Sequence, residues 1–219
     1  MSTATTPLAP ARPGGTKAGP SKAGKYAFWT VMALAGISVL IWTDWPLVHT
    51  PSGYRTKLLT DIFILIPHAI AGVLATALGP FQFSTRFRQR HLAWHRLMGK
   101  VYVIAICVAA PLAIWLELRG PTAASMRFIN TVMGVLWLGC TLIAFVTARN
   151  RQIAVHRQWM VRSYAFTLNF IFARVLNPLP AYFNISENAF AMVLAFLTIC
   201  YFVLPDVAFS WREMTHRRA

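Results

Sequence analysis

The chain has 219 residues, of which 57% are hydrophobic and only 12% are charged, and its mean hydropathy is +0.52. Soluble domains usually carry about 25% charged residues, so this composition excludes an ordinary soluble globule and predicts a membrane protein. The net charge of +15 could suggest nucleic-acid binding, but the basic residues lie in short clusters between apolar runs, as they do in membrane proteins. We therefore expect no nucleic-acid partner.

Six apolar runs of membrane-spanning length follow a polar N-terminal stretch. Residues 1–25 are rich in Ala, Pro, Gly, Thr and Lys and contain no apolar block, so we expect a disordered tail and no cleaved signal peptide. A helix needs roughly 20 residues to cross about 30 Å of hydrocarbon, and the runs of suitable length are 26–43, 58–79, 97–117, 127–147, 159–178 and 189–210. The predicted fold class is therefore all-α: a polytopic membrane helical bundle with six transmembrane helices over 26–210, followed by a basic C-terminal segment over 211–219.

The basic clusters predict the orientation of the chain in the membrane. Arginine and lysine gather in the N-terminal tail, in the 80–96 and 148–158 loops and at the C-terminus, whereas four of the six acidic residues lie on the opposite side. Cytoplasmic loops carry the excess of Lys and Arg. We therefore expect a multi-pass protein of the cytoplasmic membrane, with both termini in the cytoplasm and its basic loops against anionic lipid headgroups.

Two similar stretches open the third and the fifth predicted spans. Each has Arg-x-Arg, then His-Arg after four residues, then a Met, a basic residue and a Tyr, followed by a long apolar run. An offset of 61 residues superimposes the second and third spans on the fourth and fifth, which predicts a duplicated four-helix core over 58–178 built from parallel repeats. His95 and His156 are then symmetry mates that enter the bundle at one depth, near its cytoplasmic end.

His95 and His156 are candidate axial ligands of haem b. Neutral imidazole binds iron well, and nearby arginines can hold haem propionates by charge-assisted hydrogen bonds. The alternative is that both histidines are interfacial helix starts bonded to lipid phosphate or to loop carbonyls. The candidate cofactor-binding residues are His95, His156, Arg96, Arg157, Arg162, Tyr102, Tyr164 and His68.

A zinc site is a second possibility at the same end of the bundle. His91 and His95 are four residues apart, so they share one helical face if the helix begins early, and His156 would complete a three-histidine catalytic site. The nearest acids on that side are Asp206 and Glu213, so a general base is missing or distant. The second stretch also has no partner for His91, which favours the pair over the three-histidine set.

His68 is the deepest histidine of the predicted bundle. It precedes Ala69 and Gly72, small residues that let helices approach closely, and Asn169 lies at a similar depth in the fifth span. We expect a hydrogen bond between His68 and Asn169, and contact with a quinone or a proton is the functional alternative.

Two charged residues near span ends are expected to form ion pairs. Arg174 lies in the outer part of the fifth span, where a bare guanidinium is costly, so it should pair with Asp61 or Glu117 or extend outward. Asp206, near the inner end of the last span, should pair with one of the loop arginines.

Three of these elements also resemble a known family. They are a His-Ala start of one span at His68 to Gly72, an HR-x-x-G-x-x-Y element at His95 to Tyr102, and an R-x-x-x-x-HR-x-W-M-x-R-x-Y element at Arg151 to Tyr164. Over roughly residues 58–178 the chain resembles bacterial multi-pass membrane proteins catalogued only as a domain of unknown function. The resemblance implies a shared bundle and a shared site, but no activity. The architecture is also similar to small b-type cytochromes and ferric-reductase-type domains, which is an analogy of fold.

From these observations we expect a haem- or metal-binding redox component with its site near the cytoplasmic face and electron transfer through the bundle. A quinone or a membrane partner subunit is a candidate partner. One alternative is a non-enzymatic transporter or accessory subunit whose basic loops engage anionic lipid or a partner. The other is a zinc-dependent membrane hydrolase.

Overall fold

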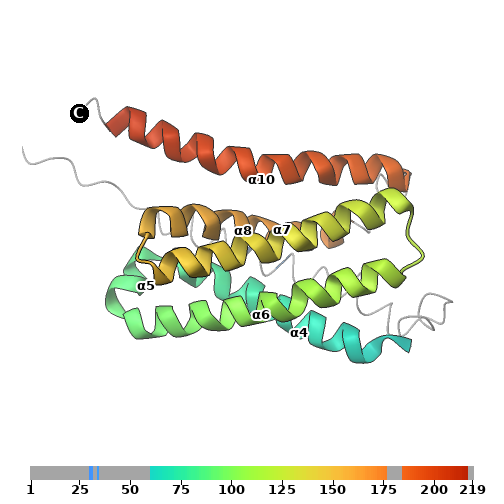
Figure 1. Cartoon of the computed structure of the whole chain (residues 1–219), viewed down its shortest axis with the longest axis horizontal. Coiled ribbons are helices and arrows are strands. Elements are labelled where there is room, and N and C mark those ends of the chain that lie inside the picture. The colour runs from blue at the N-terminus through green and yellow to red at the C-terminus, as the bar shows by residue number, and fades with distance from the viewer. Residues whose placement is uncertain (1–29, 32–33, 35–59, 177–183, 217–219) are drawn as a thin grey trace, which may run out of the picture.

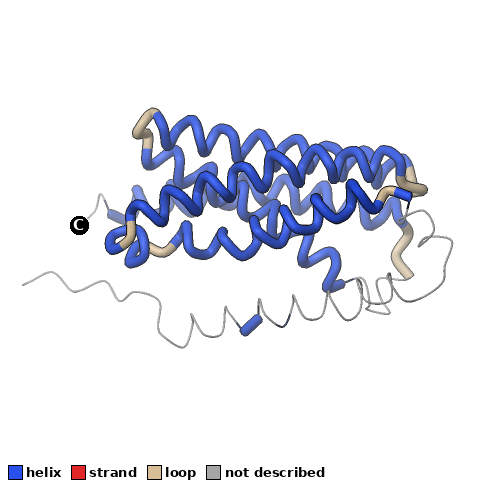
Figure 2. Tube along the Cα trace, turned by 90° about the horizontal axis from the view of Figure 1, so that it is seen from below, coloured by secondary structure: helices blue, strands red, loops and turns tan. Residues whose placement is uncertain are grey.

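The structure is a computed structural model that describes residues 30–31, 34, 60–176 and 184–216. Its long elements are helices that lie side by side along one axis (Figure 1), and loops lie only at the ends of the described helices (Figure 2). No strand occurs in these ranges, so the predicted all-α class is confirmed. The helices are α4 (Ile62–Phe83), the short α5 (Thr85–Arg90), α6 (Leu92–Arg119), α7 (Ala124–Arg149), α8 (Ile153–Leu176) and α10 (Glu187–His216).

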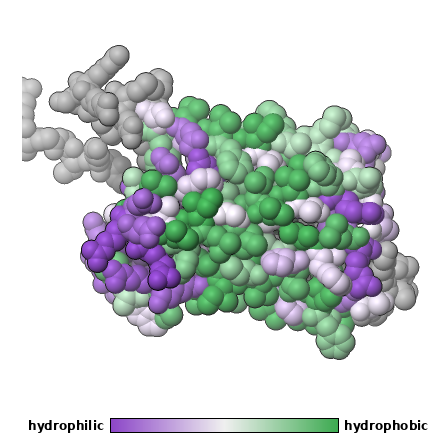
Figure 3. All heavy atoms as spheres, viewed as in Figure 1, coloured by the Kyte–Doolittle hydropathy of each residue, from purple (hydrophilic) through white to green (hydrophobic). Residues whose placement is uncertain are grey.

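Four of the described helices are long and apolar enough to cross a membrane. They are α4, α6, α7 and the Glu187–Val207 part of α10. Figure 3 shows an apolar band that covers the middle of the bundle and hydrophilic residues gathered at its ends. The predicted multi-pass character is therefore confirmed for this part of the chain, while the first predicted span, 26–43, lies almost entirely outside the described residues.

α8 is long but less apolar than these four helices. It has 24 residues, and it includes Arg162, Ser163, Thr167 and Asn169, which are all buried. Polar side chains that face the bundle rather than lipid lower the hydropathy of a helix without exposing polar groups to hydrocarbon. The buried polar side chains on the inner face of α8 therefore account for much of its low hydropathy.

α6 and α8 begin several residues before the apolar runs that predicted them. The predicted runs started at 97 and 159, whereas the helices start at Leu92 and Ile153. Basic and polar residues end an apolar run but readily continue a helix. As a result His95 and His156 lie in the first turns of α6 and α8.

A row of small residues forms the buried face of α4, which packs on α6 and, at Gly79, on Tyr164 of α8. Ala71, Ala75 and Gly79 follow one another at intervals of four and are the buried residues of α4. Small side chains on one helical face let two backbones approach closely, and this type of contact drives helix association in lipid. The expectation that Ala69 and Gly72 serve this purpose is wrong, because Ala69 is exposed and a Cβ on Gly72 would meet no atom within 4 Å.

A tight turn joins α7 and α8. Arg151 has φ 60°, the left-handed conformation usually taken by glycine after a helix C-terminus. The Arg151 N–H donates to the Ala148 carbonyl at 3.1 Å, and the Gln152 N–H donates to the Thr147 carbonyl at 2.9 Å. These two bonds form a Schellman motif, which satisfies the last carbonyls of α7 and reverses the chain within a few residues. The turn lies at the same end of the bundle as α5 (Figure 1), here called the basic end because it carries Arg86, Arg88, Arg90, Arg96, Arg149, Arg151 and Arg157.

α10 packs on α7 and α8 and is tied to α8 by two polar contacts. Arg162 of α8 forms an ion pair with Asp206, and the Tyr201 hydroxyl donates to Asn169 Oδ1 at 2.7 Å. The partner of Asp206 is thus a buried arginine within α8, and the expectation that it pairs with a loop arginine is wrong. At the opposite end, Glu187 accepts a hydrogen bond from the backbone N–H of Ala123.

Candidate functional site

The structure places His95 and His156 at the starts of two helices at the basic end. His95 is half-buried in the first turn of α6, and His156 is half-buried in the first turn of α8. Arg88, His156 and Arg96 are near enough to the His95 imidazole to act on it electrostatically. The site therefore contains an imidazole from each of two helical hairpins, with arginines nearby.

The two imidazoles differ in their hydrogen bonds. His156 Nδ1 lies 2.7 Å from the Ala144 carbonyl oxygen of α7, and since a carbonyl only accepts, Nδ1 carries the proton. In the neutral ring this leaves the Nε2 lone pair available for a ligand. His95 Nδ1, in contrast, is buried without a hydrogen-bond partner. Buried polar atoms are nearly always partnered, so such an atom needs an explanation.

A second unpartnered nitrogen lies on the same side of the site. Gln82, in the last turn of α4, has a buried Nε2 without a partner. Its Oε1 lies against Gly99, which follows His95 by one turn of α6, at 3.2 Å from where a Cβ would be. The α4–α6 side of the site thus holds two buried nitrogen atoms that the chain leaves without a partner.

His91 does not join this pair. It lies between α5 and α6, is exposed, and places its ring 5.7 Å from the Phe87 ring, measured between centroids. No group of three His, Cys, Asp or Glu side chains comes together as a metal site within the described ranges. The structure therefore does not assemble His91, His95 and His156 as a three-histidine ligand set, because the break between α5 and α6 turns His91 toward Phe87.

The three predicted arginine clamps have different surroundings. Arg96 and Arg157 are exposed at the basic end. Arg162 is only 6% exposed, pairs with Asp206, and stacks on the Trp159 ring at 4.5 Å from its centroid. Arg96 and Arg157 can therefore reach an anionic group at the site, whereas the Arg162 guanidinium is already bound.

A buried network of hydroxyl groups lies deeper in the bundle than the two histidines. The Tyr102 hydroxyl lies 2.9 Å from Ser163 Oγ and 3.2 Å from Thr167 Oγ1. The Trp137 indole N–H donates to Thr167 Oγ1 at 3.0 Å, and Thr141 Oγ1 lies 2.7 Å from Ser163 Oγ. Trp137 and Thr141 come from α7, Tyr102 from α6, and the other two from α8, so the network joins three helices.

The sequence contains a signal for this network that the prediction missed. His156, Met160, Ser163 and Thr167 follow one another at intervals of four, three and four residues, which is one face of α8. Isolated Ser and Thr residues on one face of an apolar helix indicate hydrogen bonds to neighbouring helices. Tyr102 was assigned to the cofactor site, and the structure places its hydroxyl in this network.

Tyr164 also lies deeper than the histidines. Its ring packs on Gly79 of α4, and its hydroxyl donates to the Thr76 carbonyl at 3.2 Å. Like Tyr102, it connects helices in the core of the bundle, behind the histidine pair.

His68 and Asn169 are not hydrogen-bonded to each other, and each bonds to a different residue. His68 Nδ1 donates to the Ala109 carbonyl of α6 at 2.9 Å, and Asn169 Oδ1 accepts from Tyr201. The predicted His68–Asn169 bond is therefore wrong. The physical reason is the close α4–α6 contact, which brings an α6 carbonyl within reach of His68.

Asp61 and Glu117, the two expected partners of Arg174, each contact another residue. Asp61 lies 3.8 Å from Arg119, and Glu117 accepts from the Thr122 hydroxyl at 2.8 Å. The side chain of Arg174 lies outside the described residues, so its predicted pairing stays a prediction.

Replacing Thr167 with valine should reduce the stability of the bundle. The change removes the acceptor of the Trp137 indole N–H, and a buried donor left unsatisfied costs about 1–3 kcal/mol. The matched control is Thr198→Val, because the buried Thr198 hydroxyl donates only to the Leu194 carbonyl of its own helix, at 2.8 Å. Thermal unfolding in detergent measures the difference. Equal melting temperatures for the two variants would show that the network adds nothing to stability.

Comparison with known proteins gives a family but no characterised relative. No curated protein and no solved structure matches the chain. The family described as "Predicted membrane protein (DUF2306)" matches residues 65–210, a range that covers more than half of the chain and includes His68, His95 and His156. The chain therefore belongs to this family of predicted membrane proteins.

Proposed function

We propose that the protein is a membrane redox component that binds haem b at the basic end, where His95 and His156 would hold the iron. The observation that carries this proposal is the buried, unpartnered Nδ1 of His95 beside His156. An imidazole that the protein leaves without a partner next to a second imidazole is an arrangement that a bound metal would explain.

The hydrogen bond of His156 supports the same proposal. Histidines that bind metals usually donate their other ring N–H to a carboxylate or a backbone carbonyl, which fixes the tautomer and the ring orientation. The 2.7 Å contact from His156 Nδ1 to the Ala144 carbonyl meets this description and leaves Nε2 free of this bond. The same bond would also hold an interfacial histidine that binds nothing, and an absorption spectrum distinguishes the two roles.

The surroundings of the pair suit a flat anionic cofactor. Arg96 and Arg157 are exposed at the entrance and can hold carboxylates by charge-assisted hydrogen bonds. Deeper in the bundle, the buried Tyr102 and Ser163 hydroxyls are hydrogen-bonded to each other. Haem, when bound, supplies a one-electron carrier, and the chain holds, orients and shields it.

We also propose the finer topology predicted from the sequence: six spans, a duplicated core, and both termini in the cytoplasm. Tyr102 lies beside Trp137 and Cys140, and Tyr164 lies beside Thr76 and Gly79. These neighbours are related by the same offset of 61 residues that relates His95 to His156. In this proposal α8 is a transmembrane helix whose polar face is turned to the core.

A visible absorption spectrum of the purified protein tests the haem proposal. The wild-type protein should show a Soret band that sharpens and shifts on reduction, as low-spin haem with two imidazole ligands does. His95→Ala and His156→Ala should each abolish it, while His91→Ala should retain it because His91 lies outside the pair. A colourless protein, or a Soret band unaffected by both substitutions, would contradict the proposal and favour a transporter or accessory role.

A further inference from the structure

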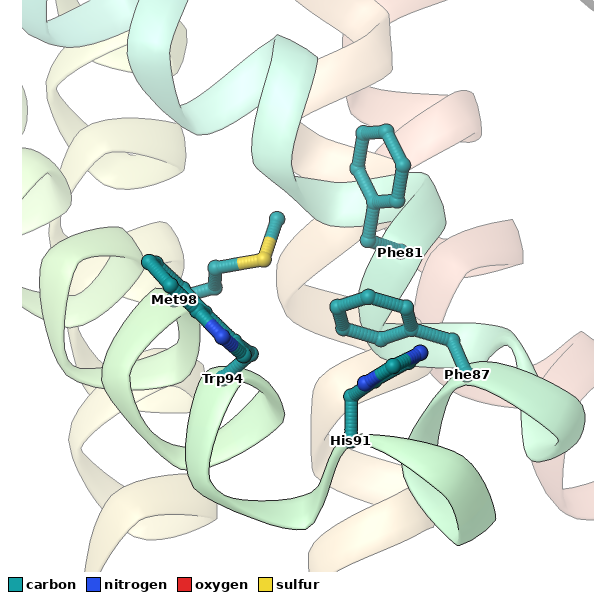
Figure 4. Close-up of a pocket in the computed structure, with 5 residues that line it drawn as sticks. All are labelled: Phe81, Phe87, His91, Trp94 and Met98. Atoms are coloured by element: carbon teal, nitrogen blue, oxygen red, sulfur yellow. The ribbon is translucent and has the colours of Figure 1, made fainter.

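A hollow lined by aromatic side chains lies at the basic end, where α4, α5 and α6 meet. It is formed by Phe81 of α4, Phe87 of α5, His91 between α5 and α6, and Trp94 and Met98 of α6, and its volume is about 350 Å³. Figure 4 shows Trp94 and Met98 on one side and the rings of Phe81, Phe87 and His91 on the other, with the Met98 thioether extending between them. The hollow is thus bounded by flat rings and one polarizable sulfur.

The hollow opens on the outer surface of the bundle at the end of two membrane-spanning helices. Phe81 lies in the last turn of α4 and Trp94 in the first turn of α6, and both helices are candidate spans. Trp94 is 61% exposed, and its neighbours Leu92 and Leu97 are exposed as well. Amphipathic aromatic residues at span ends lie at the level of the lipid headgroups. A ligand could therefore enter this hollow from the bilayer without crossing water.

Its lining selects for a flat, largely apolar ring with a polar edge. Aromatic walls favour ring stacking, and the Met98 thioether adds a favourable contact with a ring edge. Among the five lining residues, only His91 and Trp94 carry side-chain nitrogen atoms that can donate a hydrogen bond. An acyl chain would make no use of these nitrogens, and a soluble anion would gain little from the apolar walls.

We propose that this hollow binds the head group of a membrane quinone, with the ring between Trp94 and Phe87 and a quinone oxygen at His91. The quinone tail would lie along the exposed apolar side chains of α6, which include Leu97 and Ile104. The choice of a quinone over other flat lipids rests on the proposed haem function, because Trp94, which lines the hollow, directly precedes His95 in the chain. The predicted quinone contact is thereby placed at the basic end rather than at His68.

Binding of decylubiquinone to the full chain in phosphatidylcholine nanodiscs tests this proposal. Quenching of intrinsic tryptophan fluorescence gives the dissociation constant. His91→Ala removes the hydrogen bond and Phe87→Ala removes a stacking wall, and each should weaken binding by about tenfold, which corresponds to about 1.4 kcal/mol. His91→Gln, which keeps a donor, should bind nearly as well as wild type and excludes a folding defect.

Matched controls distinguish binding in this hollow from binding elsewhere on the protein. Met126→Ala alters a different hollow, lined by Thr122, Met126, Ile185, Glu187 and Phe190, and should leave binding unchanged. His156→Ala should lose the Soret band but keep decylubiquinone binding, so failure of the haem proposal and failure of this one are distinguishable. Equal affinities for wild type, His91→Ala and Phe87→Ala would overturn the proposal. So would displacement of decylubiquinone by phosphatidylglycerol in the discs, which would assign the hollow to an anionic lipid.

Discussion

Asp206→Ala should be among the most destabilising substitutions in the described part of the chain. It removes the carboxylate that neutralises Arg162, whose side chain is buried and whose Nε already lacks a partner. Leaving a buried charge uncompensated costs about 3–5 kcal/mol. The Asp206 side chain is 58% exposed, so water can partly replace it, and we expect a loss of about 2–3 kcal/mol.

A double variant shows whether this cost comes from the unpaired charge. Arg162→Met combined with Asp206→Ala removes both charges and keeps an apolar side chain against Trp159, so it should be more stable than Asp206→Ala alone. Arg119→Ala is the exposed control, because Arg119 is largely exposed and lies 3.8 Å from Asp61. It should cost less than about 1 kcal/mol. Thermal unfolding in one detergent compares all of these variants, and a double variant no more stable than the single one would show that the ion pair is not the cause.

Gly79→Ala should also destabilise the protein strongly. A Cβ at this position would overlap the Tyr164 ring, which contacts Gly79 directly. Relief of the overlap requires the ring to move, which would break the 3.2 Å hydrogen bond from Tyr164 to the Thr76 carbonyl. Overpacking of a core usually costs about 1–3 kcal/mol, and the lost hydrogen bond adds about 1 kcal/mol.

Gly72→Ala is the matched control on the same helix. A Cβ there meets no atom within 4 Å, and alanine favours the helix over glycine by up to about 1 kcal/mol, so this variant should be as stable as wild type or more so. Tyr164→Phe combined with Gly79→Ala adds a second measurement. It should not recover stability, because the ring rather than the hydroxyl causes the overlap. A Gly79→Ala protein that melts like wild type would contradict the close contact between α4 and α8.

The class of fold could be predicted because it depends on composition and on the length of apolar runs. The runs at 97–117 and 127–147 correspond to α6 and α7, and the basic clusters lie at helix ends as expected. The first residues of α6 and α8 could not be predicted as well, because His95 and His156 lie outside the apolar runs but inside the helices. The contact row of α4 was also missed, since Gly72 and Gly79 look alike in the sequence and only packing shows which of them faces a neighbour.

The histidine pair could be proposed from the sequence because two similar stretches place it at matching positions. The partners of individual polar groups could not be predicted in the same way. His68 and Asn169 lie on the correct helices for a mutual bond, yet backbone carbonyls and tyrosine hydroxyls compete for them. Asp206 could be matched to any of several arginines, and only the packing of α10 on α8 selects Arg162.

The small-residue row of α4 also limits how the bundle can move. Rotation of α4 about its own axis by a single residue position would bring Leu74 to the place of Ala75, and the larger side chain would push the neighbouring helices away. The buried face of α4 therefore holds this helix in one rotational position. α10 is held to α8 by Arg162 with Asp206, by Tyr201 with Asn169 and by the Phe166 ring against Tyr201 and Phe202, so any displacement of α10 would break polar and aromatic contacts together.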